Sequence, residues 1–109
     1  MMTLKQFVGN WRLVEMSAWD ADYLDGVVPA GIVIRKNGTG SFQFGCVQGE
    51  LDCSIDTIGG AQCLGFSWEG SDDAHPVSGR GWLTVSGMEL TGKICFHLGD
   101  ESDLKAVRT

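Results

Sequence analysis

The carboxylates are the side chains of this chain that could form a chemical site, because they are numerous and clustered. Ten of the 14 Asp and Glu residues fall in four short segments: 20–25, 50, 69–73 and 100–103. A surface so rich in negative charge attracts an amine, a metal ion or a basic protein segment, and it repels anionic lipids. Trp19 and His97 stand beside these segments and could add aromatic or imidazole contacts.

No residue is assigned a catalytic role. His97, Asp100 and Ser102 are the residue types of a nucleophilic triad. Such partners must meet in space beside an oxyanion donor, and closeness in sequence does not provide this. We therefore expect His97 to order a corner of the chain. The P-loop, the dinucleotide fingerprint and the H-E-x-x-H zinc motif are absent.

No metal or cofactor is predicted either. The pairs Asp72-Asp73 and Asp100-Glu101 could supply oxygen ligands to Ca²⁺, but their spacing is not that of an EF-hand. The four cysteines lack the C-x-x-C spacing of zinc sites. We expect free thiols that serve as small packing residues: Cys46 and Cys53 on the inner face, Cys63 and Cys95 on the outer face.

Composition narrows the class of protein and its partners. A length of 109 residues predicts one domain, spanning 1–109. The net charge of −6 argues against nucleic acid or an anionic membrane surface as a partner. The first residues lack the apolar stretch of a secretory signal, so we expect a cytoplasmic protein with reduced cysteines.

Apolar residues alternate with polar ones in short runs that Gly-rich turns interrupt. This pattern is typical of antiparallel strands with one wet face. It predicts an all-β fold, a single eight-stranded antiparallel up-and-down β-barrel, with little regular helix outside the N-terminal residues and the 19–29 link. The expected strands are 8–18, 30–35, 39–47, 50–58, 61–69, 78–85, 88–97 and 103–108.

Four turns set the expected register. Gly59-Gly60 places Leu51, Cys53 and Ile55 opposite Trp68, Phe66 and Leu64. Gln48-Gly49 places Cys46 opposite Leu51, and Ser86-Gly87 places Leu83 opposite Leu90. A three-residue loop Lys36-Asn37-Gly38, with Gly38 left-handed in a bulge, turns Ile32 and Ile34 inward. The 69–78 link is expected to be long and irregular.

The two ends of the chain resemble those of the calycin superfamily, the lipocalin and avidin-like barrels. Gly9-Asn10-Trp11 opens the first strand, and Arg108 stands near the end of the last. The resemblance implies that Arg108 lies across a buried Trp11 and closes the barrel bottom. Three further stretches, 66–70, 78–81 and 96–100, are similar to short uncharacterised bacterial proteins, a likeness that carries no activity.

The long links and most acids are expected at the other end, the open mouth. If alternate residues after Trp11 face inward, Glu15 lies on the inner face near that mouth. It would then pair with Arg80, or it would face solvent because strand one bends there. Bulky Phe66 and Trp68 opposite glycines indicate a filled core or, alternatively, a pocket floor. The residues predicted to contact a ligand are Glu15, Trp19, Trp68, Arg80 and His97.

Two classes of function remain open from the sequence. The first is a small barrel that binds a small cationic or polar ligand at its acidic mouth. The second is a ligandless structural or protein-interaction module, with an outward Trp82 beside Thr84 and Thr91 as a homodimer patch. An enzyme is the third choice. A filled interior would favour the module, and a pocket at the mouth would favour the binding barrel.

Overall fold

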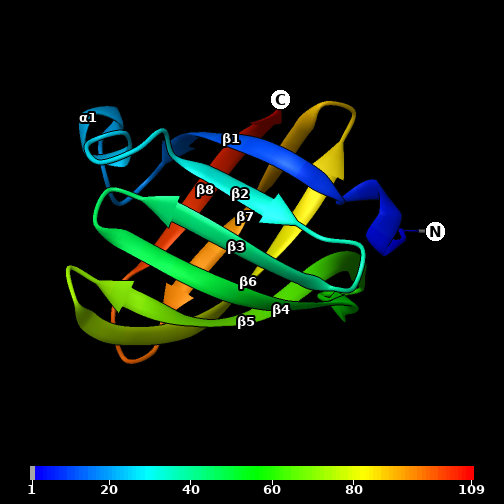
Figure 1. Ribbon diagram of the computed structural model, residues 1–109. Helices are drawn as coiled ribbons and strands as arrows, with labels where there is room; N and C mark the ends of the chain where they lie inside the picture. Colours follow the sequence, from blue (N-terminus) through cyan, green and yellow to red (C-terminus); the bar gives the residue numbers. More distant parts are fainter. Residues whose placement is uncertain (1) are drawn as a thin grey trace.

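Eight antiparallel strands close on themselves in the computed structural model, which describes residues 2–109 (Figure 1). Each strand pairs with the next along the chain, and β8 pairs with β1, so the predicted up-and-down barrel is confirmed. The strands are β1 Gly9–Met16, β2 Gly31–Ile34, β3 Thr39–Phe44, β4 Val47–Ile58, β5 Ala61–Asp72, β6 His75–Ser86, β7 Glu89–Phe96 and β8 Glu101–Arg108.

Within residues 2–109, helix is confined to two short pieces, in the regions where the sequence allowed it. A 3-10 turn covers Leu4–Gln6, and α1 covers Ala21–Leu24. Asp20 caps α1 by accepting a hydrogen bond from the Tyr23 amide at 3.0 Å. In the described part of the chain, neither helix has the length or apolar character needed to cross a membrane.

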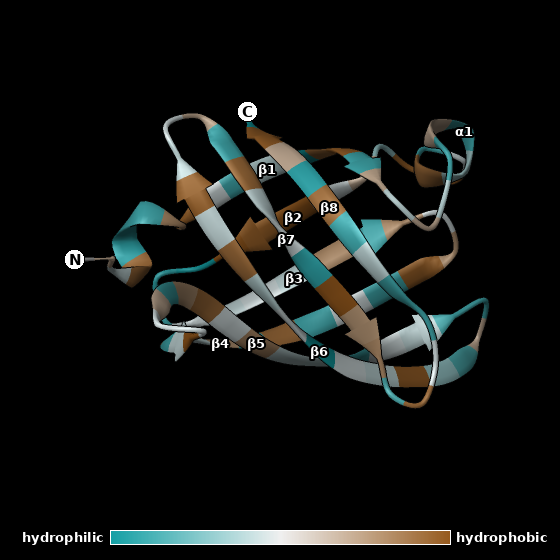
Figure 2. Cartoon of the chain, turned by 180° about the vertical axis from the view of Figure 1, so that it is seen from behind, coloured by the Kyte–Doolittle hydropathy of each residue, from teal (hydrophilic) through white to brown (hydrophobic). Residues whose placement is uncertain are grey.

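Alternation along the strands sends one set of side chains into the barrel and the other to the surface. The inner set is apolar and buried, and the bands of contrasting hydropathy along the strands show the pattern (Figure 2). Large rings face glycines across the sheet, since Phe66 is opposite Gly81 and Trp68 is opposite Gly79. This complementarity of size fills most of the core.

Two of the predicted turns have the expected geometry. The Gly59-Gly60 turn pairs Leu51 with Trp68 and Ile55 with Leu64, as predicted. Gly38 has a φ of +87°, and the loop before it turns Ile32 and Ile34 into the core. That loop is the predicted bulged connection.

Two other turns are displaced from their predicted positions. The β3–β4 turn is at Gly45-Cys46, three residues earlier than predicted, so Phe42 pairs with Gly49. Cys46 is therefore exposed in a turn and does not face inward. The β6–β7 turn is at Gly87-Met88, and Leu83 pairs with Gly92 rather than Leu90. In both cases glycines with positive φ form the actual turn: Gly45 at +54° and Gly87 at +62°.

The 69–78 segment is a hairpin and not the long irregular link that was predicted. β5 and β6 continue to Asp72 and His75, and only Asp73 and Ala74 connect them. Both connecting residues have positive φ, at 47° and 73°, which is the conformation of a two-residue type I′ turn. This hairpin extends the sheet beside the mouth.

The two barrel ends differ as expected. The turns at 36–38, 59–60 and 87–88 lie at the end where β1 begins and β8 ends (Figure 1). Trp11 is buried there, with the Arg108 guanidinium carbon 4.1 Å from its ring centroid. The predicted closure by Trp11 and Arg108 is confirmed. The 17–30 segment, with α1, lies at the opposite end.

Candidate ligand-binding site

Five aromatic rings close the mouth of the barrel. Trp19, from the segment after β1, contacts Phe44 at a centroid distance of 5.0 Å and Phe96 at 5.8 Å. Phe44 stacks on Phe42 at 5.7 Å. Trp68 meets Phe42 and Phe96 edge-on, each at 5.0 Å, which completes the circle. These spacings are those of favourable aromatic pairs, so the rings form a packed plug.

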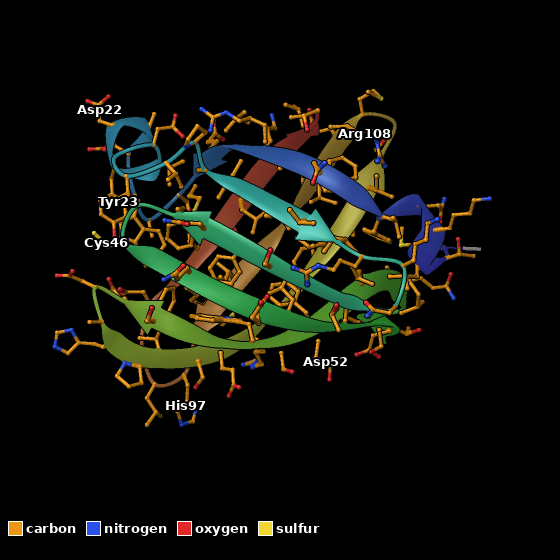
Figure 3. All side chains as sticks on the ribbon, in the orientation of Figure 1. Asp22, Tyr23, Cys46, Asp52, His97 and Arg108 are labelled. Carbon is orange, nitrogen blue, oxygen red and sulfur yellow. The ribbon has the colours of Figure 1, made fainter. Side chains whose placement is uncertain are left out.

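The 17–30 segment is fixed over this plug by polar contacts. Arg12 donates to both carboxylate oxygens of Asp25, at 2.7 and 2.6 Å, and the Ala30 amide donates to the same carboxylate at 2.9 Å. These bonds, with the Arg12 contact first, lower the pKa of Asp25 from 3.8 to about 2. Tyr23 lies against Gly45, and its hydroxyl accepts from the Cys46 amide at 3.4 Å (Figure 3).

The barrel interior leaves no room for a ligand. The space enclosed by Leu13, Ile32, Leu51, Leu83 and Leu104 amounts to about 10 Å³. A water molecule needs roughly 10–15 Å³ together with polar partners, and this lining is apolar. The sequence left open a filled core or a pocket floor beside the glycines, and the structure has the filled core. Any binding must therefore occur on the outside of the barrel.

A transverse row of outward side chains crosses five strands near the mouth. The pairing places Val33 opposite Ser41, Ser41 opposite Glu50, Glu50 opposite Glu69, and Glu69 opposite Ser78. The Glu50 and Glu69 carboxylates are thus direct cross-strand neighbours, with Cβ atoms about 4.5–5.5 Å apart in such a pair. Like charges in this position destabilise a sheet.

The two carboxylates line a surface groove of about 620 Å³. His97, Pro76 and Ser78 line its far side, and the His97 amide donates to the Ser78 carbonyl at 2.8 Å. Glu50 is 3.9 Å from the basic side chain of Arg35. Within residues 2–109, Glu69 has no ion-pair partner. The groove therefore carries uncompensated negative charge.

The five residues predicted to contact a ligand do not meet in one site. Trp19 and Trp68 belong to the aromatic plug. His97 is exposed at the rim (Figure 3), and it shares a neighbouring hollow of about 420 Å³ with Arg80. Glu15 faces solvent opposite Lys105, because a β-bulge between Leu13 and Glu15 reverses the alternation. The inward placement of Glu15 was wrong, and the alternative in which strand one bends is the correct one.

Sequence reasoning did not single out the Glu50–Glu69 pair. The signal was present, because the Gly59-Gly60 register, continued past Leu51 and Trp68, places these two acids opposite each other. The link from Glu50 to Ser41 needs the β3–β4 register, which was displaced by the turn error. Among the described residues, no three His, Cys, Asp or Glu side chains are arranged to hold a metal ion.

The cysteines divide by environment. Cys53 faces the core, as predicted, and burial first and the Asp52 charge second raise the pKa of its thiol from 9.0 to about 11. Cys63 is on the opposite face of β5 from Leu64 but is nevertheless buried, and burial raises the pKa of its thiol. Cys95 is partly exposed on β7 opposite Arg80.

Comparison with protein-family models, with curated proteins and with solved structures gives no match for this chain.

Proposed function

We propose that this chain is a calycin-like cytoplasmic barrel that binds a small cationic ligand on the outside of its rim, between Glu50 and Glu69. The observation that carries the proposal is the direct cross-strand opposition of these carboxylates in a groove of about 620 Å³. A bound cation between them would replace a repulsive pair with two attractive contacts.

The surroundings of the carboxylates support a cation of organic type. Pro76 contributes apolar surface to the groove beside the inward Val77 and Phe96, and the Ser78 and His97 side chains contribute polar atoms. A guanidinium or ammonium on a short carbon chain fits such a lining, because its charged end needs the carboxylates and its carbon chain needs apolar contact. The net charge of −6 would draw it in from solution.

Binding of agmatine, a small guanidinium compound, to matched variants tests the proposal. Isothermal titration at low and high salt should give binding to the wild type that weakens as salt rises. E69Q should abolish it. E89Q is the control, because it removes the same charge at the start of β7, where Glu89 pairs with Lys105 at 3.9 Å. Equal binding by E69Q and E89Q would contradict the proposal.

A protein-interaction module is the second candidate, and the filled interior favours it. In this reading the chain forms a homodimer through the outer face of β6 and β7, where Trp82 is half-buried and the Thr84 and Thr91 hydroxyls lie 3.1 Å apart. Sedimentation of the wild type and W82A distinguishes the two candidates. A dimer that W82A dissociates supports the module, and a wild-type monomer at all concentrations excludes this dimer.

A further inference from the structure

The acidic groove does not end at Glu50. A second groove of about 540 Å³ shares Glu50, Glu69 and Gly70 with the first and continues across β3 and β2 to Val28 and Pro29. The two grooves adjoin at these residues, and together they extend across the outside of the sheet from the segment before β2 to the β5–β6 hairpin; we call the pair the depression. It is much longer than a small amine requires.

The chemistry of this depression changes along its length. One end is apolar, with Val28, Pro29 and Val33. Two acids occupy the centre. Between them and the apolar end, Gln43 and Gln48 face outward from β3 and β4. Within residues 2–109, neither glutamine side chain has a hydrogen-bond partner, so both amides are free to pair with a peptide backbone.

The spacing between strands sets the distance between the apolar end of the depression and its two acids. Val33 and Glu50 are separated by two strand intervals along the row, or about 10 Å at about 4.8 Å for each interval. An extended peptide advances about 3.3 Å for each residue. An apolar side chain on Val33 and a basic side chain at the acids would therefore be about three residues apart in one chain.

We infer that the occupant of this depression is an extended peptide segment, with an apolar side chain on Val33 and an Arg or Lys about three residues away between Glu50 and Glu69. The inference rests on the proposed cation site and names the class of molecule that carries the cation. Charge complementarity selects a basic segment, and the free glutamine amides suit a peptide backbone.

Arg35 limits the negative charge of the site. Its guanidinium lies 3.9 Å from Glu50 and also donates to the Thr39 and Ser41 hydroxyls, at 3.3 and 3.4 Å. A peptide cation would compete with Arg35 for Glu50. R35Q should therefore bind a basic peptide more tightly than the wild type, since it frees Glu50 without touching Glu69.

Two blocked tetrapeptides test the inference by isothermal titration. One carries leucine, two glycines and arginine, and the other has glycine in place of the leucine. The leucine peptide should bind about tenfold more tightly, because part of the leucine side chain leaves water on Val33. V33S should remove that advantage and leave the glycine peptide unaffected. V27S is the control, because Val27 is 60% exposed and outside the groove.

The outcomes separate this inference from the proposed function. If both peptides and agmatine bind equally, depend on Glu69 and ignore V33S, the cation site stands and the peptide inference is overturned. If neither peptide nor agmatine binds, both fail. Tighter leucine-peptide binding that V33S and E69Q each reduce, and that R35Q increases, is the expected result.

Discussion

Arg108 lies across Trp11, with its guanidinium carbon 4.1 Å from the ring centroid, and the two residues are directly opposed on β8 and β1. The same guanidinium donates to the Val8 and Gln6 carbonyls, each at 2.9 Å. The Trp11 indole N–H donates to the Phe7 carbonyl at 2.8 Å. One cation–π contact and three hydrogen bonds thus join the first strand, the last strand and the residues before β1.

Removal of the Trp11 ring should destabilise the barrel strongly. Trp11→Ala is expected to lower the free energy of unfolding by about 3–5 kcal/mol, because it empties a fully buried site and removes the surface on which Arg108 rests. Urea unfolding measures the change. Trp82→Ala is the control, since the half-buried Trp82 is on the outer face, and its loss should be smaller. Equal losses would contradict the closure.

The plug of rings at the mouth depends on a missing side chain at Gly49. A Cβ atom there would lie 2.8 Å from both the Phe42 and Trp68 rings, too close for either to remain in place. Gly49→Ala should therefore lower the free energy of unfolding by about 1–3 kcal/mol through overpacking. Gly65→Ala on β5 is the matched control, because a Cβ atom there would come no closer than 3.3 Å to another atom, the Cβ of Asp56. A neutral Gly49→Ala would show that the rings are not packed as described.

The Asp25–Arg12 contact should make the 17–30 segment sensitive to acid. The pKa of Asp25 is lowered from 3.8 to about 2, so its contribution to stability is complete above the unfolded pKa and is lost as pH falls through about 2. Urea unfolding at several pH values should show Asp25→Asn less stable than the wild type near neutral pH. The difference should shrink in acid. Asp22→Asn is the control, because Asp22 makes no ion pair among residues 2–109, and an equal loss of stability in both variants would contradict the assignment.

Thiol labelling should separate the cysteines by position. Cys46 is exposed in the β3–β4 turn, whereas Cys53 is buried with a pKa raised to about 11. Because the thiolate is the reactive form, Cys46 should react rapidly with a disulfide reagent at mildly alkaline pH and Cys53 only after unfolding. Cys46→Ser should remove the fast phase. Fast labelling of Cys53 in the folded protein would show that its strand is misplaced.

The fold was largely predictable because period-two alternation and glycine turns restrict the strand order. The Gly59-Gly60 turn gave correct partners for Leu51 and Ile55, and the bulged loop at Gly38 was identified by the need to turn Ile34 inward. The matching termini predicted the Trp11–Arg108 contact, which joins residues 97 positions apart in sequence.

The two displaced turns share one physical cause. When a two-residue turn moves by one residue along the chain, each residue of the first strand pairs with a residue two positions away from its former partner. Because side chains alternate with a period of two, the same side chains still point inward. Phe42 and Leu83 remain in the core under either pairing. Alternation alone therefore cannot choose between Gly45-Cys46 and Gln48-Gly49. The choice depends on three-dimensional contacts, such as the Tyr23 ring on Gly45.

The candidate site was less predictable than the fold, because it depends on irregularities. A bulge after Leu13 turned Glu15 to solvent. The extension of β5 and β6 to the Asp73-Ala74 turn changed an expected flexible link into one wall of a groove. The bulge also makes Met16, and not Glu15, the next buried residue after Leu13, so a strict period-two pattern places both on the wrong face.

The most direct test of the central claim is an amide chemical-shift map of the protein titrated with agmatine. Binding at the outer rim predicts concentration-dependent shifts at Glu50, Glu69 and Ser78, lost in E69Q and retained in E89Q. Amides of the filled interior, such as Leu83 and Leu104, should not move. Shifts confined to those core positions, or no shifts at low salt, would contradict recognition of a cation on the outside of this barrel.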